Sequence, residues 1–334
     1  MKRMLLASAA LLAMAMPGMA QAQEYTFALV PKALNNPFFD LARDGCMAAQ
    51  EESDGAITCE YVGPSAHTEM EQIQIVQDLI SRGVDGIAVA PSNAPAMGRA
   101  LRAAQQAGIP TITWDSDLLP EDAQYRSTYI GTKNYDIGVN LAKLAQKAKP
   151  EGGTICLQSG GAAAANHNER MQGLRDTLSG TQSETPPGER LAGEGGWTEV
   201  DGCPLFTDDD SAKGVQQLSD ILNRYGDLDV FVVTGAFTLI ADNAFRQALA
   251  GVKDKIDAGE LVMLAADTLP MEMQQVRDGL VAGLVGQKPY DMGHQSMFLL
   301  KDLAEGKEVQ DPIFTGLDVC EQSNIDTCVK QGGS

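Results

Sequence analysis

The sequence has few positively charged residues and few aromatic ones. Lys and Arg total 25 against 45 Asp and Glu, which gives a formal net charge of −20. Such a chain repels nucleic-acid phosphates and the surface of anionic membranes, so general nucleic-acid binding is excluded. Aromatic residues make up only 5% of the 334 residues, whereas 34 are Gly. This composition favours tightly packed α/β structure, and the length predicts two domains.

Long apolar runs are missing outside the beginning of the chain, so no transmembrane helix is predicted. After a positively charged start, an apolar segment extends from Leu5 to Met16, and Ala20-Gln21-Ala22 has the small-x-small pattern of a cleavage site. We therefore expect residues 1–22 to be a secretory signal peptide that is cleaved before Gln23.

Motifs for metal, nucleotide and nucleophile chemistry are also missing. No C-x2-C pair occurs, and the three histidines lie far apart. Gln158–Gly161 lacks the phosphate-loop pattern, and Ser159 is not part of G-x-S-x-G. The acidic segment Thr207–Ser211 lacks the EF-hand spacing and is expected to be a solvated loop that caps the next helix. The sequence thus predicts no metal and no cofactor.

Six cysteines are present, an even number that fits export to an oxidising compartment. Six cysteines allow 15 pairings, and six independent buried thiols are the alternative. Proximity along the chain favours Cys46–Cys59 and Cys320–Cys328, which leaves Cys156–Cys203.

Short β-rich runs alternate with helical patterns along the chain, which predicts two doubly wound lobes with parallel sheets. Tyr129–Gly131 is expected to be an edge or crossover strand, and 179–194 a surface excursion. The other predicted strands are 25–30, 57–62, 86–90, 111–114, 153–157, 230–233, 262–265 and 281–286. The predicted helices are 37–52, 69–82, 94–107, 134–148, 168–178, 211–225, 239–250, 270–278 and 290–304.

Ligands in such sheets bind beyond the carboxyl ends of the strands. Because candidate side chains follow strands of both arrays, a ligand that contacts them all would lie between the lobes. Carboxylates, Arg and amides hydrogen-bond hydroxyl groups, and aromatic rings pack on the C–H face of a sugar, so this set suits polyol recognition. The candidates are Lys32, Asn36, Phe38, Phe39, Asp115, Arg170, Thr234, Asp267 and Gln287.

Most of these candidates also have a purely structural interpretation. The two phenylalanines could form the core of a first helical turn, and the two aspartates could cap the helices that follow them. Arg170 could pair with an acidic neighbour on a helix surface. Trp114 could wall the cleft or belong to the core, and His167 could contact a ligand or lie in a solvated loop.

The chain resembles the type I periplasmic sugar-binding proteins of the ribose-binding kind over nearly its whole length after the leader. No single motif is decisive, but the order and spacing of several segments are specific together. These segments are 28–39, Val76–Leu79, Gly86–Pro91, Ile109–Asp115, Glu169–Gly173, Asp267 and Gln287.

The resemblance implies a periplasmic protein that delivers its ligand to an inner-membrane ABC permease, and some members of the family also signal to chemoreceptors. It implies a monomer with three crossings between lobes. One lobe would comprise 23–132 plus 288–316, and the other 133–287 plus 317–334. The family's sugar contacts fall on Asn36, Phe38, Phe39, Asp115, Arg170, Asp267 and Gln287.

The chain departs from the ribose pattern at several positions, which indicates another sugar or a linear polyol. Ser116 stands in place of an Arg, Thr234-Gly235 in place of an Asn-Asp pair, and Ala266 in place of an aromatic residue. A third stacking aromatic is missing near 206–209, where aspartates occur instead. Lys32 and Arg170 could select an acidic sugar, but two aspartates offset them and favour a neutral ligand.

A secreted carbohydrate-acting enzyme is the alternative, with Asp115 and Asp267 as acid and base. Nearby Arg170 and Lys32 are expected to keep both carboxylates ionised, whereas an acid catalyst needs a proton. A DNA-binding repressor of the same fold would need a helix-turn-helix where the leader lies, so it is excluded.

Overall fold

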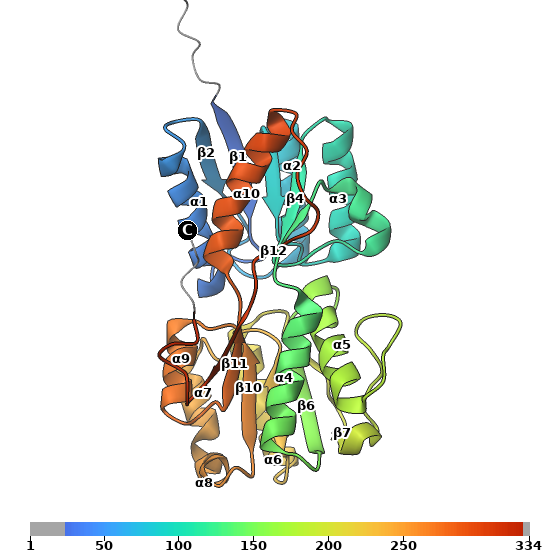
Figure 1. Ribbon diagram of the computed structural model, residues 1–334, viewed down its shortest axis with the longest axis vertical. Coiled ribbons are helices and arrows are strands. Elements are labelled where there is room, and N and C mark those ends of the chain that lie inside the picture. Colours follow the sequence, from blue (N-terminus) through green and yellow to red (C-terminus); the bar gives the residue numbers. More distant parts are fainter. Residues whose placement is uncertain (1–23, 330–334) are drawn as a thin grey trace, which may run out of the picture.

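Two β-sheets, one in each lobe, form the framework of the molecule (Figure 1). The computed structural model describes residues 24–329. In the first lobe all neighbouring strands are parallel. Their order is β12 (Ile313–Phe314), β5 (Tyr129–Gly131), β4 (Thr111–Trp114), β3 (Gly86–Val89), β1 (Tyr25–Val30) and β2 (Ile57–Tyr61).

Helices cover both faces of the first sheet, which explains why its central strands are apolar on both sides. Helices α1 (Pro37–Glu52) and α10 (Pro289–Ala304) lie side by side on one face, where Phe27 and Leu29 pack with Met297 (Figure 1). Helices α2 (Glu69–Arg82) and α3 (Ala94–Gln106) cover the other face.

The second lobe repeats this plan with one antiparallel strand, β13, beside β11. The strand order is β13 (Asp318–Glu321), β11 (Gly283–Gly286), β10 (Val262–Ala266), β9 (Val230–Val233), β6 (Gly153–Ser159) and β7 (Trp197–Glu199), with β8 (Leu205–Phe206) also paired to β6. Helices α4 (Asn134–Ala148) and α5 (Ala165–Ser179) cover one face. The other face carries α6 (Ser211–Arg224), α7 (Asp242–Leu249) and α9 (Pro270–Arg277), and the short α8 (Lys253–Asp257) follows α7.

The chain passes between the two sheets three times, after β5, after β11 and after β12. The strands on either side of each passage therefore belong to different lobes. The residue limits given above for the two lobes remain a prediction, because the sheets assign strands and not the residues that link them.

Two glycines let α4 and α5 approach closely. A Cβ atom on Gly138 would lie 2.0 Å from the carbonyl oxygen of Arg170, and one on Gly173 would lie 2.1 Å from that of Tyr135. Any larger side chain at either position would push the helices apart, so the backbone of Arg170 is located by this contact.

Several expected elements differ from the structure. Of the two predictions for Tyr129–Gly131, the edge strand is wrong, because β12 pairs outside it, and the crossover strand is correct, because the chain passes to the other sheet after β5. Helix α5 begins at Ala165 rather than 168. Its N-cap residue, Ala164, has no side chain that can cap the helix, so the sequence carries no signal for this start. Helix α7 begins at Asp242 rather than 239. Strands β7, β8, β12 and β13 were not predicted, since they are short and only partly buried and so lack a continuous apolar run.

All three predicted disulfides are confirmed: Cys46–Cys59, Cys156–Cys203 and Cys320–Cys328. They join α1 to β2, β6 to the segment before β8, and β13 to the turn that follows it. The alternative of independent thiols is therefore wrong for this chain.

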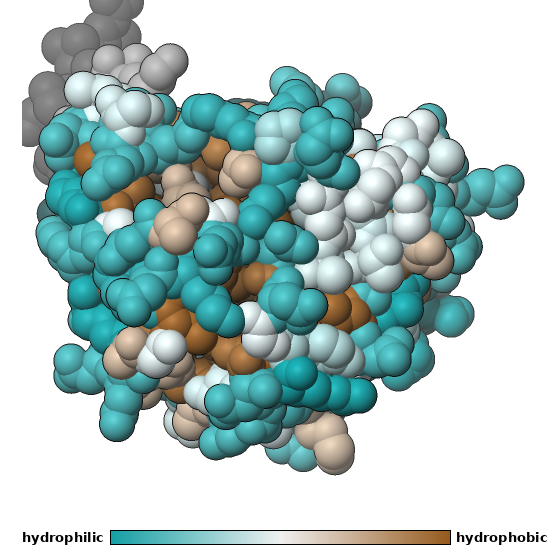
Figure 2. Space-filling view, turned by 90° about the horizontal axis from the view of Figure 1, so that it is seen from below, coloured by the Kyte–Doolittle hydropathy of each residue, from teal (hydrophilic) through white to brown (hydrophobic). Residues whose placement is uncertain are grey.

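The outer end of the second lobe is mostly hydrophilic, with apolar side chains visible in hollows between polar ones (Figure 2). Ile256, Leu261 and Val281 line a pocket of this lobe. The predicted signal peptide at 1–22 and its cleavage site lie outside the described residues. Between 24 and 329, no helix combines the length and hydrophobicity that a membrane span needs.

Candidate functional site

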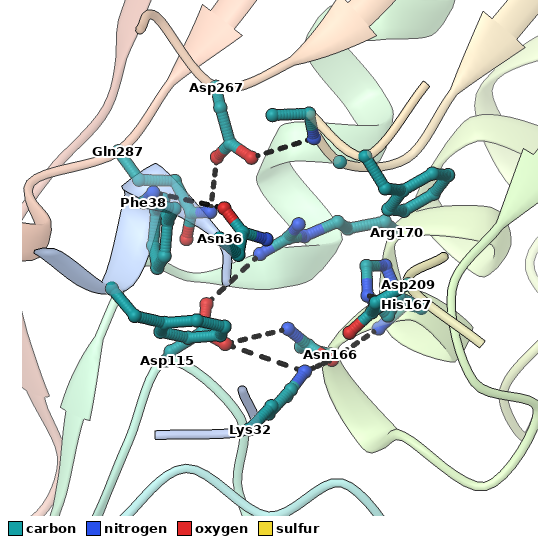
Figure 3. Close-up of a pocket in the computed structure, with 14 residues that line it drawn as sticks. Lys32, Asn36, Phe38, Asp115, Asn166, His167, Arg170, Asp209, Asp267 and Gln287 are labelled. Atoms are coloured by element: carbon teal, nitrogen blue, oxygen red, sulfur yellow. Dashed lines mark hydrogen bonds and ion pairs between the residues drawn. The ribbon is translucent and has the colours of Figure 1, made fainter. Parts of the chain in front are cut away.

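A small cavity lies between the lobes, at the carboxyl ends of the strands of both sheets (Figure 3). Eight of the nine predicted site residues line it, and their contact with a ligand remains a prediction. The lining residues are Lys32, Asn36, Phe38, Phe39, Asp115, Asn166, His167, Arg170, Asp209, Gly235, Ala236, Phe237, Asp267 and Gln287.

The ninth predicted residue, Thr234, lies behind the cavity wall. Its hydroxyl is 3.0 Å from Nδ1 of His167, and its carbonyl oxygen accepts a hydrogen bond of 2.7 Å from Nη1 of Arg170. Thr234 thus positions two lining residues instead of lining the cavity itself.

The aromatic wall belongs to the first turn of α1. Asn36 caps this helix, since its side chain accepts a 3.0 Å hydrogen bond from the backbone N–H of Phe38. Phe38 and Phe39 meet edge to face with ring centroids 5.3 Å apart, and both line the cavity. Trp114 is fully buried behind Phe39, which it meets at 5.7 Å, so its structural interpretation is the correct one.

Lys32, Asp115 and Asn166 form a polar contact across the cleft (Figure 3). Lys32 of the first lobe donates a 2.9 Å hydrogen bond to Asn166 of α5, and its Nζ lies 3.4 Å from Asp115. Asn166 in turn donates to Asp115 at 3.2 Å. Asp115 therefore pairs with groups of both lobes and does not cap a helix.

Arg170 is buried and points into the cavity, not onto the surface of its helix. Its Nε donates to Asn134 at 2.9 Å, and its Nη2 lies 3.6 Å from the carboxylate of Asp115. Among the described residues Nη2 has no hydrogen-bond partner. Asn134 was not predicted. It begins α4 directly after the chain crosses between the lobes.

Asp267 and Gln287 form the wall opposite Lys32. One oxygen of Asp267 accepts from the backbone N–H of Ala236 at 3.0 Å, and the other accepts from Gln287 at 2.7 Å. Burial raises the pKa of Asp267 above its ordinary value, although Arg170 opposes this shift. The sequence predicted that nearby cations would keep Asp267 ionised, but the effect of burial on its pKa is larger than that of Arg170. Asp267 also does not cap a helix.

His167 and Asp209 complete the cavity on the side of the second lobe. His167 lies in the first turn of α5 and is buried, so it does not belong to a solvated loop. Burial lowers its pKa to about 4. The side chain of Asp209 is only 6% exposed, contrary to the predicted solvated loop. Asp210 does cap α6, as expected, by accepting from the N–H of Lys213.

Three aspartates that line the cavity have left-handed backbone conformations, with φ of 58° at Asp115, 56° at Asp209 and 82° at Asp267. Non-glycine residues rarely adopt such angles, and those that do concentrate at functional sites. Each turn directs a carboxylate into the cavity from the end of a strand.

Strand ends are also the signal for lining residues that were not singled out. Asn166 lies in the segment 160–170 that follows β6, and Phe237 follows β9. Asp209 follows the two-residue strand β8, which the sequence does not reveal. Within residues 24–329, no three His, Cys, Asp or Glu side chains are arranged to hold a metal ion.

Known proteins share this architecture. Residues 27–308 match the family model described as the periplasmic binding protein domain. The ribose import binding protein of Salmonella typhimurium is 26% identical over 286 residues, which cover 85% of this chain and 86% of that protein. The D-ribose/D-allose-binding protein of Pseudomonas aeruginosa is 24% identical over 78% of this chain and 76% of its own.

Two solved structures are similar as well. An ABC transporter solute-binding protein of Burkholderia graminis in complex with D-arabinose has a TM-score of 0.77 and 29% identity, and the match covers 93% of this chain and all of that one. A solute-binding protein of Agrobacterium vitis with bound D-fucose has a TM-score of 0.80 and 26% identity, over 90% and 97% of the two chains. The two lobes, the cavity between them and a family match over most of the chain lead to one conclusion: this chain belongs to the periplasmic binding protein family.

Proposed function

We propose that this protein captures a neutral sugar or polyol between its lobes in the periplasm and delivers it to an inner-membrane ABC importer. The relatives named above are binding proteins for ribose and allose, and the two solved structures hold D-arabinose and D-fucose. Each of these ligands is a neutral monosaccharide.

The observation that carries the proposal is a pair of buried polar atoms that have no hydrogen-bond partner within residues 24–329. Nη2 of Arg170 can only donate, and Oε1 of Gln287 can only accept. Both residues line the cavity beside two phenyl rings. A sugar supplies hydroxyl oxygens that accept, hydroxyl hydrogens that donate, and a C–H face that packs on aromatic rings.

We propose no catalysis. Both oxygens of Asp267 accept hydrogen bonds from protein donors, which opposes protonation of this carboxylate although burial raises its pKa. Asp115 forms ion pairs with Lys32 and Arg170. An acid catalyst would need a protonated carboxyl, so binding explains the site better than glycoside hydrolysis.

Delivery requires a partner that distinguishes the closed lobes from the open ones. We propose an inner-membrane permease in this role and a chemoreceptor as a second reader, with the binding protein itself a monomer. The ligand shifts the population towards the closed state, so the partner senses the ligand without contacting it.

A thermal-shift screen, followed by calorimetric titration, tests the proposed function. The panel contains D-arabinose, D-fucose, D-ribose and D-allose, with D-galacturonate and amino acids as competing classes. A sugar at about 100 times its Kd stabilises the folded state by about 2.7 kcal/mol. We expect at least one neutral sugar to raise the Tm clearly.

The variant Arg170→Gln should lose this shift, because it loses the buried donor. Arg246→Gln, on the surface of α7, is the matched control and should keep it. A response to amino acids or sugar acids alone would contradict the proposal.

A further inference from the structure

Asp209 belongs to the second lobe and lines the cavity beside His167. It follows β8, and its left-handed backbone turns the carboxylate inward. The backbone N–H of Asp209 donates to the hydroxyl of Thr207 at 3.1 Å, and Thr207 is tied to the end of β6 through Ser159. The loop is therefore fastened to the sheet and holds the carboxylate in one place.

The end of β6 leaves room for this carboxylate because it is followed by a glycine. A Cβ atom on Gly160 would lie 2.0 Å from Oδ1 of Asp209 and 2.5 Å from Nε2 of His167. Any other residue at position 160 would displace both groups. The backbone thus makes space for an acidic group in the cavity wall.

The protein does not fully satisfy this buried carboxylate. Oδ1 lies 3.5 Å from Nε2 of His167, and Oδ2 lies 3.7 Å from Nε2 of His67 in the first lobe. Both distances exceed those of ordinary hydrogen bonds. Within residues 24–329 Oδ1 has no hydrogen-bond partner. A buried acceptor in this state is costly unless a ligand donates to it.

The neighbouring histidine favours the charged form of Asp209. His167 is neutral at pH 7, because burial lowers its pKa to about 4, so only one ring nitrogen carries a proton. The hydroxyl of Thr234 can donate to Nδ1, which places the proton on Nε2, facing Asp209. Burial alone would raise the pKa of Asp209, but His167 and the charge of Lys32 lower it below its ordinary range.

Asp209 also changes the charge balance of the cavity. Lys32 and Arg170 are countered by three lining carboxylates, those of Asp115, Asp209 and Asp267. With His167 neutral, the cavity has one more acidic group than basic ones. An anionic ligand would meet this excess at close range among buried side chains.

We propose that Asp209 is a specificity-determining residue that accepts a hydrogen bond from a hydroxyl group of the bound sugar and excludes sugar acids. This inference rests on the proposed function, because it names the selectivity of the same site. His167 acts as a positioning residue for Asp209, and Phe237, which meets His167 edge to face at 5.8 Å, fixes the ring.

The variant Asp209→Asn tests this role, with Asp208→Asn as its matched control. Both residues have left-handed backbones, which asparagine tolerates, so neither variant should strain the loop. Asp208 is 58% exposed and pairs with Lys213 on the surface. Calorimetry with the tightest-binding neutral sugar of the panel should show at least a tenfold loss of affinity for D209N and less than a twofold change for D208N.

Competition against D-galacturonate gives a second measurement. The affinity for this acid relative to the neutral sugar should rise at least tenfold in D209N, because the excess acidic charge is removed. A merely structural role of Asp209 would weaken both ligands equally and leave the ratio unchanged.

Monodeoxy derivatives of the same sugar locate the contact. One derivative should bind to the original protein at least tenfold more weakly than the parent sugar does. The same derivative and the parent sugar should bind to Asp209→Ala with about equal affinity. The absence of such a derivative, or equal affinities of D209N and D208N for the sugar, would overturn the role of Asp209. Failure of the unaltered protein to bind any neutral sugar would instead overturn the proposed function.

Discussion

Glu169, beside Arg170 on α5, is a carboxyl whose pKa is raised to about 7, firstly by burial and secondly by the negative charge of Asp117 in the first lobe. An acid with a raised pKa in the folded state binds a proton there more readily than in the unfolded chain. The contribution of Glu169 to stability is therefore largest at low pH, falls as the pH rises from about 4.5 to 7, and stays reduced above that range.

The variant Glu169→Gln removes this dependence. We expect it to stabilise the protein at pH 8 by about 1–2 kcal/mol, after allowance for the partial exposure of the side chain, and to change little at pH 4.5. The measurement is the difference in melting temperature between Glu169→Gln and the original protein at each of the two pH values. The contributions of the other titrating groups cancel in this difference. An equal shift at both pH values would contradict the assignment.

At the scale of single residues, the sequence located most of the cavity wall because parallel strands bring their carboxyl ends together. This rule holds for Asp115, Asp267 and Gln287, which follow strands that are buried along their whole length. It could not find Asp209, since the strand before it has only two residues. It also could not separate Thr234, which supports the wall, from residues that line it.

Among the elements, the pair α4 and α5 positions Arg170 through a glycine contact. Replacement of Gly138 by Ala would place a methyl group 2.0 Å from the carbonyl oxygen of Arg170. The helices must then separate, which should cost about 1–3 kcal/mol of stability and move the guanidinium.

We expect Gly138→Ala to lower the Tm and to weaken sugar binding severalfold by calorimetry. The matched control is Gly251→Ala, since a Cβ atom on Gly251 meets nothing within 4 Å. Unchanged affinity in Gly138→Ala would show that the helix contact does not locate Arg170.

Periodicity predicted the long helices and the buried strands well, because their packing requires apolar residues at regular spacing. It failed for β12 and β13, whose two and four residues owe their conformation to pairing with β5 and β11. It also placed the start of α7 too early. Leu239 is buried among core side chains in the turn before the helix, and so extends the apolar pattern.

Across the whole molecule, the lobes touch at points beyond the cavity. The backbone N–H of Ala94 in the first lobe donates to the carbonyl of Ala163 in the second at 3.0 Å. The side chain of Ser116 accepts from the N–H of Asn166 at 3.4 Å. These contacts, together with the pair of Lys32 and Asn166, describe closed lobes.

Small-angle X-ray scattering should detect this closure. Addition of the sugar identified by the thermal screen is expected to reduce the radius of gyration, because the lobes rotate together about the crossings. A sugar that does not bind serves as the control. Calorimetric binding without any change in the radius of gyration would contradict closure.

The order of the strands also limits when the protein can fold. The first sheet begins at Tyr25, yet its edge strand is β12, and Met297 and Leu300 of α10 supply part of the core around Phe27. About 290 residues must therefore be available before the first lobe can complete its core. When only the first half of the chain has been synthesised, the first lobe still lacks α10 and β12. The first lobe is thus expected to complete its folding only after almost the whole chain has been synthesised.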